Sequence, residues 1–487
     1  MATTDSDLSR CDLLIEGGAL IDGSGDERVR ADVAIRGDRI SRVGDLKGMD
    51  ADARIDATGL VVAPGFIDAH THDDRAVMST PDMTPKLSQG VTTVVTGNCG
   101  VSLAPLTNRE PVPPLNLLGG LDWYRYSSMR EYMAEVEAAP PAINLAPMVG
   151  HTTLRVATMD NLDRPAGDEE IESMRALLDE ALEAGCIGMS TGLAYAPAIA
   201  APTDEVVALA ERLRPHGGVF TTHMRNESDK VLESVAETLE IGQRAGVSVV
   251  ISHHKCCGRK NYGLTKKTLA AIREARTHQT VDLDVYPYIA SSTVLIAESV
   301  ASSERVLVTW STPHPECAGR DFADICSEWD ASVDQTIERL QPAGAIYYQM
   351  DEEDLRRVLT FEDAMIGSDG LPHDEFPHPR LWGTFPRVLG HYSRDVGLFS
   401  LEQAVRRMTA VPARVFGLTD RGVVREHAYA DLVLLDPDTV SDSANFESPK
   451  QPAAGIRHVI VNGSPVWRAD AWTGGRPGRI LRREPAH

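Results

Sequence analysis

The sequence lacks several features that define whole classes of protein. Its 7 cysteines are an odd number, and its start has neither the basic nor the apolar region of a secretory signal, so we expect reduced thiols rather than a disulfide framework. No run is long and apolar enough to span a bilayer. Only 48 Lys and Arg stand against 71 Asp and Glu, and a net charge of −23 argues against nucleic acid or an anionic membrane as the main partner. We therefore expect a cytoplasmic protein that can act on small substrates. The sequence favours no oligomeric state.

The central part of the chain alternates between helix and strand patterns. A helix expected over 169–184, capped by Asp168 and ended by Gly185, precedes an apolar strand at 186–190. The same order recurs, with later strands at 219–223, 247–253, 281–286 and 364–370. Repeated units of this kind predict a parallel sheet with helical cover. This many in a row favour an α/β fold of the (β/α)8, TIM-like barrel type over an open sheet.

Both ends of the chain have a β pattern instead. Gly37-Asp38 near the start and Asn462-Gly463 near the end are hairpin signals between short apolar runs. We predict that residues 1–62 and 415–487 join in one small β-domain, with the barrel at 63–414. The stretch of about 289–350, rich in Ser, Trp, Pro and acidic residues, breaks the alternation and is expected to be an insertion near the barrel mouth.

Candidate metal ligands follow the predicted strands. His70 and His72 close the apolar run that begins at Leu60, and residues two apart on a strand point to the same face. Active sites of parallel barrels lie at the carboxyl ends of the strands. The other candidates at such positions are Cys99, His223, His253 and Asp369. Imidazole with thiolate suits zinc better than hard-oxygen metals, so the sequence predicts a zinc site. His254 cannot point inward together with its neighbour His253.

These residues lie in motifs that resemble the N-acyl-D-amino-acid deacylases (D-aminoacylases) of the amidohydrolase superfamily, over essentially the full length. The motifs are Pro-Gly-Phe-Ile-Asp-Ala-His-Thr-His-Asp-Asp at 64–74, Thr-Gly-Asn-Cys-Gly at 96–100, Ser-Thr-Gly-Leu at 190–193, Thr-His-Met-Arg at 222–225, Ile-Ser-His-His-Lys at 251–255 and Gly-Ser-Asp-Gly at 367–370. The combination is specific, although no single motif is. The resemblance implies hydrolysis of the amide bond of N-acyl-D-amino acids; the D configuration comes from the resemblance alone.

The resemblance also implies roles for individual residues. Cys99, His223 and His253 would hold a tight zinc, and His70 and His72 with Cys99 a possible second, weaker one. A cysteine would take the place of the bridging lysine of many amidohydrolases, and residues 186–192 contain no lysine. The residues implied around the substrate α-carboxylate are Lys255, Tyr286, Ser292 and Arg380.

The catalytic chemistry follows from the residue types. Zinc lowers the pKa of a bound water toward ~7 and polarises a carbonyl group. Asp369, at the end of the last barrel strand, is then placed to accept a proton from water and to return it to the leaving amine. An apolar or neutral amino-acid side chain is weakly favoured, since no spare basic pair is obvious for an acidic one.

Three alternatives stay open at this point. Residues 188–192 match Gly-x-Ser-x-Gly, which would make Ser190 the nucleophile of a serine hydrolase, but that motif belongs on an open sheet and leaves the His, Cys and Asp set unexplained. A cyclic-amide hydrolase of the hydantoinase or dihydroorotase kind is disfavoured by the missing lysine. A non-catalytic barrel serving as a binding module is disfavoured because every expected ligand is present. Cys256 and Cys257 are not spaced as a redox pair and are expected to be structural.

Overall fold

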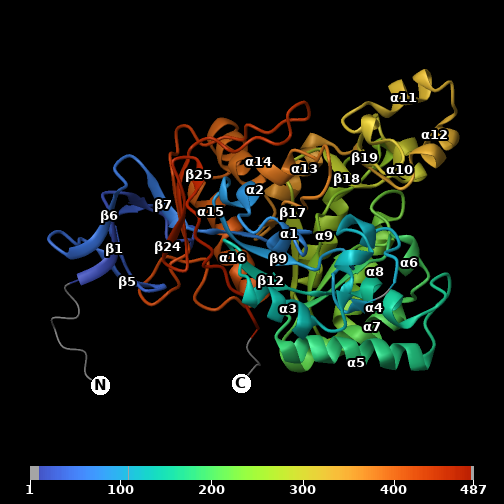
Figure 1. Cartoon of the computed structure of the whole chain (residues 1–487), viewed down its shortest axis with the longest axis horizontal. Coiled ribbons are helices and arrows are strands. Elements are labelled where there is room, and N and C mark those ends of the chain that lie inside the picture. Colours follow the sequence, from blue (N-terminus) through green and yellow to red (C-terminus); the bar gives the residue numbers. More distant parts are fainter. Residues whose placement is uncertain (1–9, 108, 484–487) are drawn as a thin grey trace.

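A computed structural model of the chain describes residues 10–107 and 109–483. Figure 1 shows strands from both ends of the chain on one side and a larger α/β body on the other. Within the described ranges, no helix has the length and apolar character needed to cross a membrane. The domain boundaries predicted at residues 62 and 414, between the β-domain and the barrel, remain predictions. Residues 1–9 and 484–487, which include the start inspected for a signal, lie outside the described residues.

The larger body is the predicted (β/α)8 barrel. Its strands pair in parallel with their neighbours. One strand is interrupted at Met148, and its two parts are β12 and β13. In order around the ring they are β8 (Phe66–Asp68), β9 (Val91–Thr96), β12 (Asn144–Pro147) with β13 (Val149–Gly150), β14 (Gly188–Gly192), β15 (Val219–His223), β16 (Ser248–Ile251), β17 (Val281–Val285) and β21 (Met365–Ile366). The ring closes where the backbone N–H of Ala69 donates to the carbonyl of Ile366 at 3.3 Å, and where Thr71 forms a parallel bridge with Gly370.

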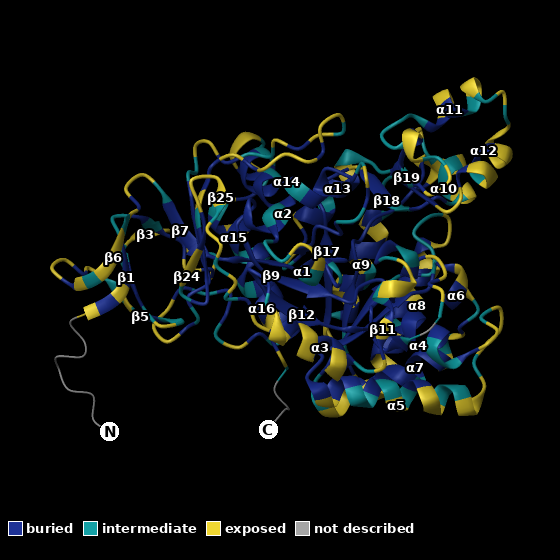
Figure 2. Cartoon of the chain, in the orientation of Figure 1, coloured by how far each residue is buried: buried dark blue, intermediate teal, exposed yellow. Residues whose placement is uncertain are grey.

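The barrel interior is filled by apolar side chains from strands all around the ring. Strand β9 is buried along its whole length, as expected for a strand with helices outside and side chains inside. One buried cluster includes Ile67, Val95, Ala146, Ile187, Val219, Val250 and Met365. Figure 2 shows the same division, with buried strands in the middle and exposed residues on the outer faces of the helices.

Helices follow the strands and cover the ring. They are α1 (Ala76–Ser79), α2 (Thr84–Leu87), α3 (Met129–Ala138), α4 (His151–Thr158), α5 (Asp168–Ala184), α6 (Ala196–Ile199), α7 (Thr203–Ala210), α8 (Val231–Ala245), α9 (Thr265–Ala275), α13 (Glu352–Leu359), α14 (Arg380–Arg387), α15 (Leu401–Met408) and α16 (Ala410–Phe416). In α5, the predicted cap is wrong by one residue. Gly167 is the N-cap and its N–H donates to the Glu170 side chain at 2.8 Å, while Asp168 is the first helical residue. Gly185 ends the helix with φ of 104°, as predicted.

The β-domain contains strands from both ends of the chain. One sheet has the order β5-β4-β1-β6 and the other β25-β24-β23-β22-β7-β2-β3. Their bounds are β1 (Arg10–Glu16), β2 (Ala19–Leu20), β3 (Val29–Arg30), β4 (Asp32–Arg36), β5 (Arg39–Gly44), β6 (Asp50–Asp56), β7 (Val61–Pro64), β22 (Leu432–Leu435), β23 (Ile456–Val461), β24 (Ser464–Arg468) and β25 (Ala471–Trp472). Both predicted hairpins are present, with Arg36 opposite Arg39 and Val461 opposite Ser464.

The insertion folds on a sheet of its own beside the barrel mouth. Its antiparallel strands β18 (Ala290–Val294), β20 (Ala343–Tyr348) and β19 (Arg305–Ser311) lie in that order. Helices α10 (Ala297–Ser302), α11 (Phe322–Glu328) and α12 (Val333–Leu340) project beyond this sheet at the upper right of Figure 1. Phe322 and Tyr347 belong to its separate core. Elsewhere, β10 (Leu106–Thr107) and β11 (Arg125–Tyr126) form a short hairpin.

Candidate metal centre

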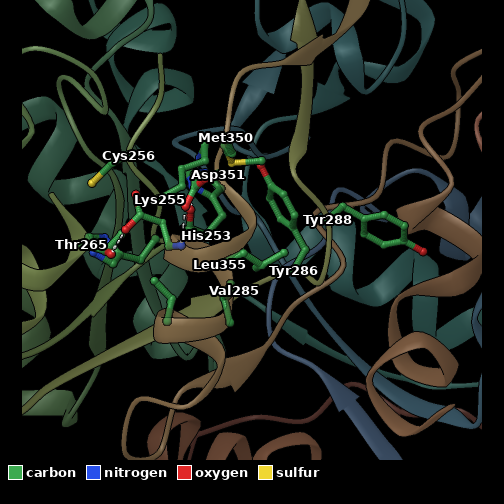
Figure 3. Close-up of a pocket in the computed structure, with 13 residues that line it drawn as sticks. His253, Lys255, Cys256, Thr265, Val285, Tyr286, Tyr288, Met350, Asp351 and Leu355 are labelled. Atoms are coloured by element: carbon green, nitrogen blue, oxygen red, sulfur yellow. Dashed lines mark hydrogen bonds between the residues drawn. The ribbon is translucent and has the colours of Figure 1, made fainter. Parts of the chain in front are cut away.

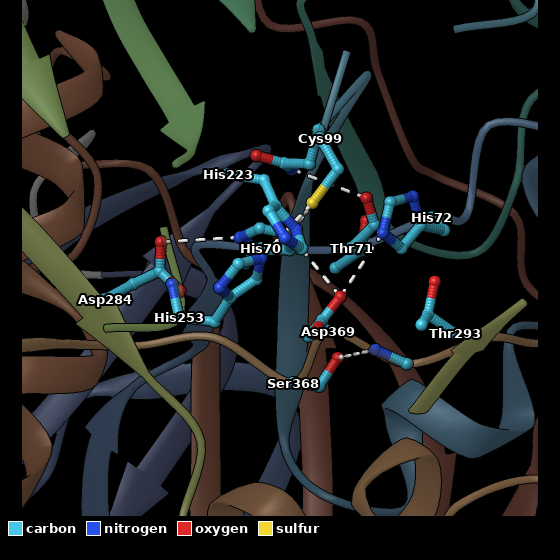
Figure 4. Close-up of polar contacts among 12 residues, drawn as sticks. His70, Thr71, His72, Cys99, His223, His253, Asp284, Thr293, Ser368 and Asp369 are labelled. Carbon is cyan, nitrogen blue, oxygen red and sulfur yellow. Dashed lines mark hydrogen bonds and ion pairs between the residues drawn. The ribbon is translucent and has the colours of Figure 1, made fainter. Parts of the chain in front are cut away.

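His70, His72 and Asp369 converge where the first and last barrel strands end. The Oδ1 atom of Asp369 lies 3.4 Å from Nε2 of His70 and 3.2 Å from Nε2 of His72 (Figure 4). Strand β8 stops at Asp68, so both histidines lie just beyond it. Their rings nevertheless approach with centroids 5.7 Å apart, close enough for both to face one ion.

Cys99 joins these residues to a second group of ligands. Its Sγ lies 3.2 Å from Nε2 of His70 and 3.4 Å from Nε2 of His253. Two sets of donor atoms each lie within 4.8 Å of one another, and they share this thiol: His70, His72, Cys99 and Asp369 in one, and Cys99, His223 and His253 in the other. The structure therefore brings together all six residues that the sequence proposed around the metal.

The backbone at the centre is strained. Cys99, His253 and Asp369 have φ values of 52°, 36° and 49°, in the left-handed region that residues with side chains rarely adopt. Such conformations cost roughly 1–3 kcal/mol each and cluster at functional sites. All three residues follow shortly after the end of a barrel strand, and all three side chains belong to the donor sets of the centre.

The charges of the site favour ionised ligands. Burial raises the pKa of the Cys99 thiol, but the charges of His70 and His253 outweigh it and hold that pKa well below its ordinary value. Burial likewise raises the pKa of the Asp369 carboxyl, yet Arg380 and His70 bring it well below its ordinary range. A thiolate, imidazoles and a carboxylate, all nearly buried, form a borderline-soft donor set that fits zinc.

Sequence reasoning missed two carboxylates that contact the ligands from behind. Asp284, on β17, accepts a hydrogen bond from the backbone N–H of His253 at 2.8 Å, and its other oxygen lies 3.4 Å from Nδ1 of His70. Glu227 lies 3.1 Å from Nδ1 of His253. Asp284 and Asp282 are two buried carboxylates that alternate with apolar residues in β17, and this pattern could have identified Asp284. Glu227, in the loop after β15, has no such signal.

Glu227 settles which nitrogen of His253 carries the proton. Nε2 faces Cys99, so binding a metal through Nε2 requires the proton on Nδ1. The neighbours of Nδ1 are Glu227 and the Nζ of Lys255, which lies 2.8 Å away and is itself a donor. Only the carboxylate can accept that proton, and a histidine ligand oriented in this way is common in metal sites. The same Glu227 forms an ion pair with Lys255 at 2.7 Å.

The predicted carboxylate-binding residues lie next to the ligands. Arg380 is fully buried, pairs with Asp369 at 3.0 Å and donates to the backbone carbonyl of Ser292 at 3.0 Å. Its guanidinium lies 4.6 Å from the ring centre of Tyr286. The Tyr286 hydroxyl, the Ser292 hydroxyl and Nε of Arg380 are buried without a hydrogen-bond partner among the described residues. Unpaired buried donors of this kind are costly unless a ligand satisfies them.

A cavity lies beside these residues. It is small, with a volume of about 20 Å³, and His253, Lys255 and Tyr286 are among the residues that line it (Figure 3). Its remaining lining is mainly apolar but includes two carboxylates: His254, Cys256, Thr265, Val285, Tyr288, Met350, Asp351, Asp354, Leu355 and Val358.

Four residues considered in the sequence have structural roles or surroundings away from the ligands. Nε2 of His254 lies 2.7 Å from the Thr268 hydroxyl on α9, away from the ligands. The Ser190 hydroxyl donates to the carbonyl of Gly97 and accepts from the N–H of Gly100 at 2.8 Å, so it serves the loop that carries Cys99. Cys256 and Cys257 are buried free thiols whose pKa is raised by burial.

Comparison with known proteins gives close matches. The model of the Amidohydrolase family matches residues 53–467. D-aminoacylase of Alcaligenes xylosoxydans xylosoxydans is 52% identical over 483 residues, which cover 99% of this chain and 100% of the relative. N-acyl-D-glutamate deacylase of the same organism is 49% identical over 482 residues, covering 98% and 97%.

Solved structures agree. A structure of D-aminoacylase, from work on one-metal activation and second-metal attenuation in its binuclear centre, superposes with a TM-score of 0.96 at 53% identity, covering 97% of this chain and all of the other. N-acyl-D-glutamate deacylase of Bordetella bronchiseptica, bound to zinc and a phosphonate that mimics the tetrahedral intermediate, superposes with a TM-score of 0.94 at 46% identity and the same coverage. D-hydantoinase, at 16% identity, a TM-score of 0.60, and coverage of 98% of this chain and 100% of that one, shares the fold alone.

Proposed function

Because this chain belongs to the amidohydrolase family, a family of metal-dependent hydrolases, we propose that it is a zinc-dependent N-acyl-D-amino-acid deacylase. It would release a carboxylate and a free D-amino acid. The observation that carries the proposal is the juxtaposition of two ligand sets sharing Cys99 with a buried, partly unsatisfied set of Arg380, Tyr286 and Ser292. One group can act on an amide bond while the other holds the carboxylate next to it.

Zinc, when bound, supplies a water of lowered pKa and polarises the acyl carbonyl. Cys99, His223 and His253 would hold the tight ion, and His70 and His72 with Cys99 the weaker one. Relatives support this choice, since one is solved with zinc and another has a binuclear centre.

Asp369 is the proton carrier of the proposed reaction. Its low pKa keeps it ionised before the reaction, so its carboxylate can accept a proton from the attacking water. It can then donate that proton to the departing amine. Arg380, which pairs with it, keeps the carboxylate oriented and at the same time presents free donors to the substrate α-carboxylate. With the substrate fixed at its carboxylate and at its acyl carbonyl, the side chain and the hydrogen of Cα can still exchange places, so a third contact, with the side chain, would select a single configuration.

We further propose a neutral amino-acid side chain. The cavity beside Lys255 is lined by Val285, Met350 and Leu355, and its charged lining includes Asp351, which would repel a second carboxylate. The charge of Lys255 is already paired with Glu227.

The test is a hydrolysis screen of N-acetyl-D- and N-acetyl-L-amino acids with and without added zinc. We expect N-acetyl-D-leucine to be cleaved faster than its L form and faster than N-acetyl-D-glutamate, with activity lost to a chelator. Equal rates on the D and L forms would contradict the assignment. Inhibition by a serine-directed phosphonate without effect of the chelator would instead favour Ser190, and hydrolysis of hydantoins alone would favour a cyclic-amide hydrolase. Protein that binds no zinc and cleaves no substrate would revive the non-catalytic barrel.

A further inference from the structure

A fully buried lysine lies under the metal centre, at the seam between the first and last barrel strands. Lys86, on α2, has its Nζ within 2.8 Å of Oδ2 of Asp68, 2.8 Å of the Ser368 hydroxyl and 3.2 Å of Asp73. The ammonium group donates hydrogen bonds to Asp68 and Ser368, and it forms an ion pair with Asp73. A buried charge is expensive unless it is paired and hydrogen-bonded, and here it is both.

The residues that Lys86 joins are neighbours of the candidate metal ligands. Asp68 lies two residues before His70, and its Oδ1 accepts the backbone N–H of Ser368 at 2.7 Å. Ser368 immediately precedes Asp369, and its hydroxyl accepts the backbone N–H of Gly370 at 3.2 Å. One lysine thus ties the end of β8 to the end of β21.

Few backbone contacts join the two strands at this seam among the described residues. Strands β8 and β21 are short, at 3 and 2 residues, and they share no continuous ladder. Their backbone contacts are the bond from Ala69 to Ile366, the bridge of Thr71 with Gly370 and a 2.8 Å bond from the N–H of Asp369 to the carbonyl of His70. Side-chain contacts across the seam include the bonds of Ser368 to Asp68 and to Lys86 and the contacts of Asp369 with His70 and His72, so the lysine adds to a small set of bonds.

We propose that Lys86 is a positioning residue that fixes His70 and His72 relative to Asp369, acting through Asp68 and Ser368. The residues assigned to the tight zinc belong to other strands: Cys99 follows β9, His223 ends β15 and His253 follows β16. Lys86 should accordingly serve the weaker metal site and the proton carrier, and leave the tight zinc alone. The proposal rests on the proposed function only in its kinetic part.

The test uses Lys86→Met and Ser368→Ala in the full chain. Ser368→Ala keeps the charged pairs and the backbone bond from residue 368 to Asp68, and it removes the bonds of the hydroxyl to Lys86 and to the N–H of Gly370. Ser252→Ala is a matched control, because Ser252 is equally buried and immediately precedes His253, but its hydroxyl has no hydrogen-bond partner among the described residues. Zinc affinities are measured by titrating metal-free protein against a chelator, and kcat and KM with N-acetyl-D-leucine.

We expect both seam variants to bind the second zinc about 10–100-fold more weakly, with the first zinc unchanged, as is usual when a support behind a ligand is lost. The value of kcat should fall about tenfold or more while KM stays near that of the wild type, and Ser252→Ala should match the wild type in every measurement. If Lys86→Met does not fold, Ser368→Ala decides alone.

The proposal is overturned if both zinc affinities and kcat of Ser368→Ala equal those of the wild type, if both sites weaken equally, or if the wild type takes up no second zinc. The zinc measurements need no substrate, so a wrong deacylase assignment would show itself separately, as wild-type protein that binds zinc normally but does not cleave N-acetyl-D-leucine.

Discussion

Replacing Arg380 by lysine separates its charge from its geometry. In the structure, one terminal nitrogen of Arg380 pairs with Asp369 and the other donates to the carbonyl of Ser292, while Nε has no hydrogen-bond partner among the described residues. A lysine has one nitrogen and cannot occupy these positions together. Because the buried carboxylate of Asp369 is the strongest acceptor nearby, the new ammonium should pair with it. The substrate α-carboxylate would then lose a bidentate partner.

The expected size of the effect follows from that loss. A hydrogen bond to a charged group contributes about 1.5–3 kcal/mol, and each 1.4 kcal/mol is a factor of ten in binding. We therefore expect KM for N-acetyl-D-leucine to rise about 10–100-fold. The value of kcat should fall only a few-fold, since Asp369 keeps a cationic neighbour.

The assay compares N-acetyl-D-leucine with its amide, which lacks the α-carboxylate. The wild type should prefer the acid strongly, and Arg380→Lys should lose most of that preference. Arg225→Lys is the control, because Arg225 also binds a carboxylate, Glu237 at 2.8 Å, but outside the predicted site. An unchanged ratio of acid to amide in Arg380→Lys, or the same loss in the control, would show that Arg380 does not bind the substrate carboxylate.

Three more predictions test the metal, the proton carrier and the acid stability. Cys99→Ala should lose the tight zinc together with activity, and undiminished zinc by elemental analysis would contradict the shared-ligand arrangement; His70→Ala should affect zinc content less. Asp369→Asn should retain that zinc yet lower kcat by roughly 10²–10⁴; a near-normal kcat would place the base elsewhere. For Glu205, burial raises the pKa, but hydrogen bonds from His151 and Arg155 outweigh it and bring that pKa from 4.5 to about 2. A lowered pKa stabilises the fold above pH 4.5, and this stabilisation of about 3 kcal/mol is lost as the pH falls toward 2. The free energy of unfolding in urea, measured between pH 5 and 3, should depend less on pH for Glu205→Gln than for the wild type. Equal slopes would show that ionised Glu205 does not stabilise the fold.

The convergence of the ligands could be predicted because it depends on local rules. Parallel strands end at one rim of a barrel, so polar residues that follow apolar strands meet there whatever the distances in sequence. This placed Cys99 beside His253, although they are 154 residues apart. The left-handed backbone of Cys99 could not be predicted, since no pattern of residue types distinguishes it from an extended backbone.

The supporting residues could not be predicted, because their partners come from distant segments with no repeating pattern. Lys86 lies on a four-residue helix, too short to show a helical period, and its partner Ser368 is 282 residues away. Glu227 is in a loop, where exposed carboxylates are common. From the sequence alone, each would be interpreted as a solvated surface charge, yet Lys86 is buried, the Glu227 side chain is only 9% exposed, and both are paired.

Lys255 shows how a prediction can succeed for a reason other than the one given. Alternation along a strand placed it on the same face as His253, but β16 ends at Ile251 and the positive φ of His253 takes the chain out of strand geometry. Lys255 still lies against His253, because its ammonium is drawn to Glu227 behind that ring. The charge of Lys255 is therefore paired with Glu227 before any substrate binds, whereas Nε of Arg380 has no hydrogen-bond partner in the part of the chain that the structure describes. If the carboxylate is held as proposed, removing Arg380 should raise KM more than removing Lys255, and removing Lys255 should disturb the tight zinc as well.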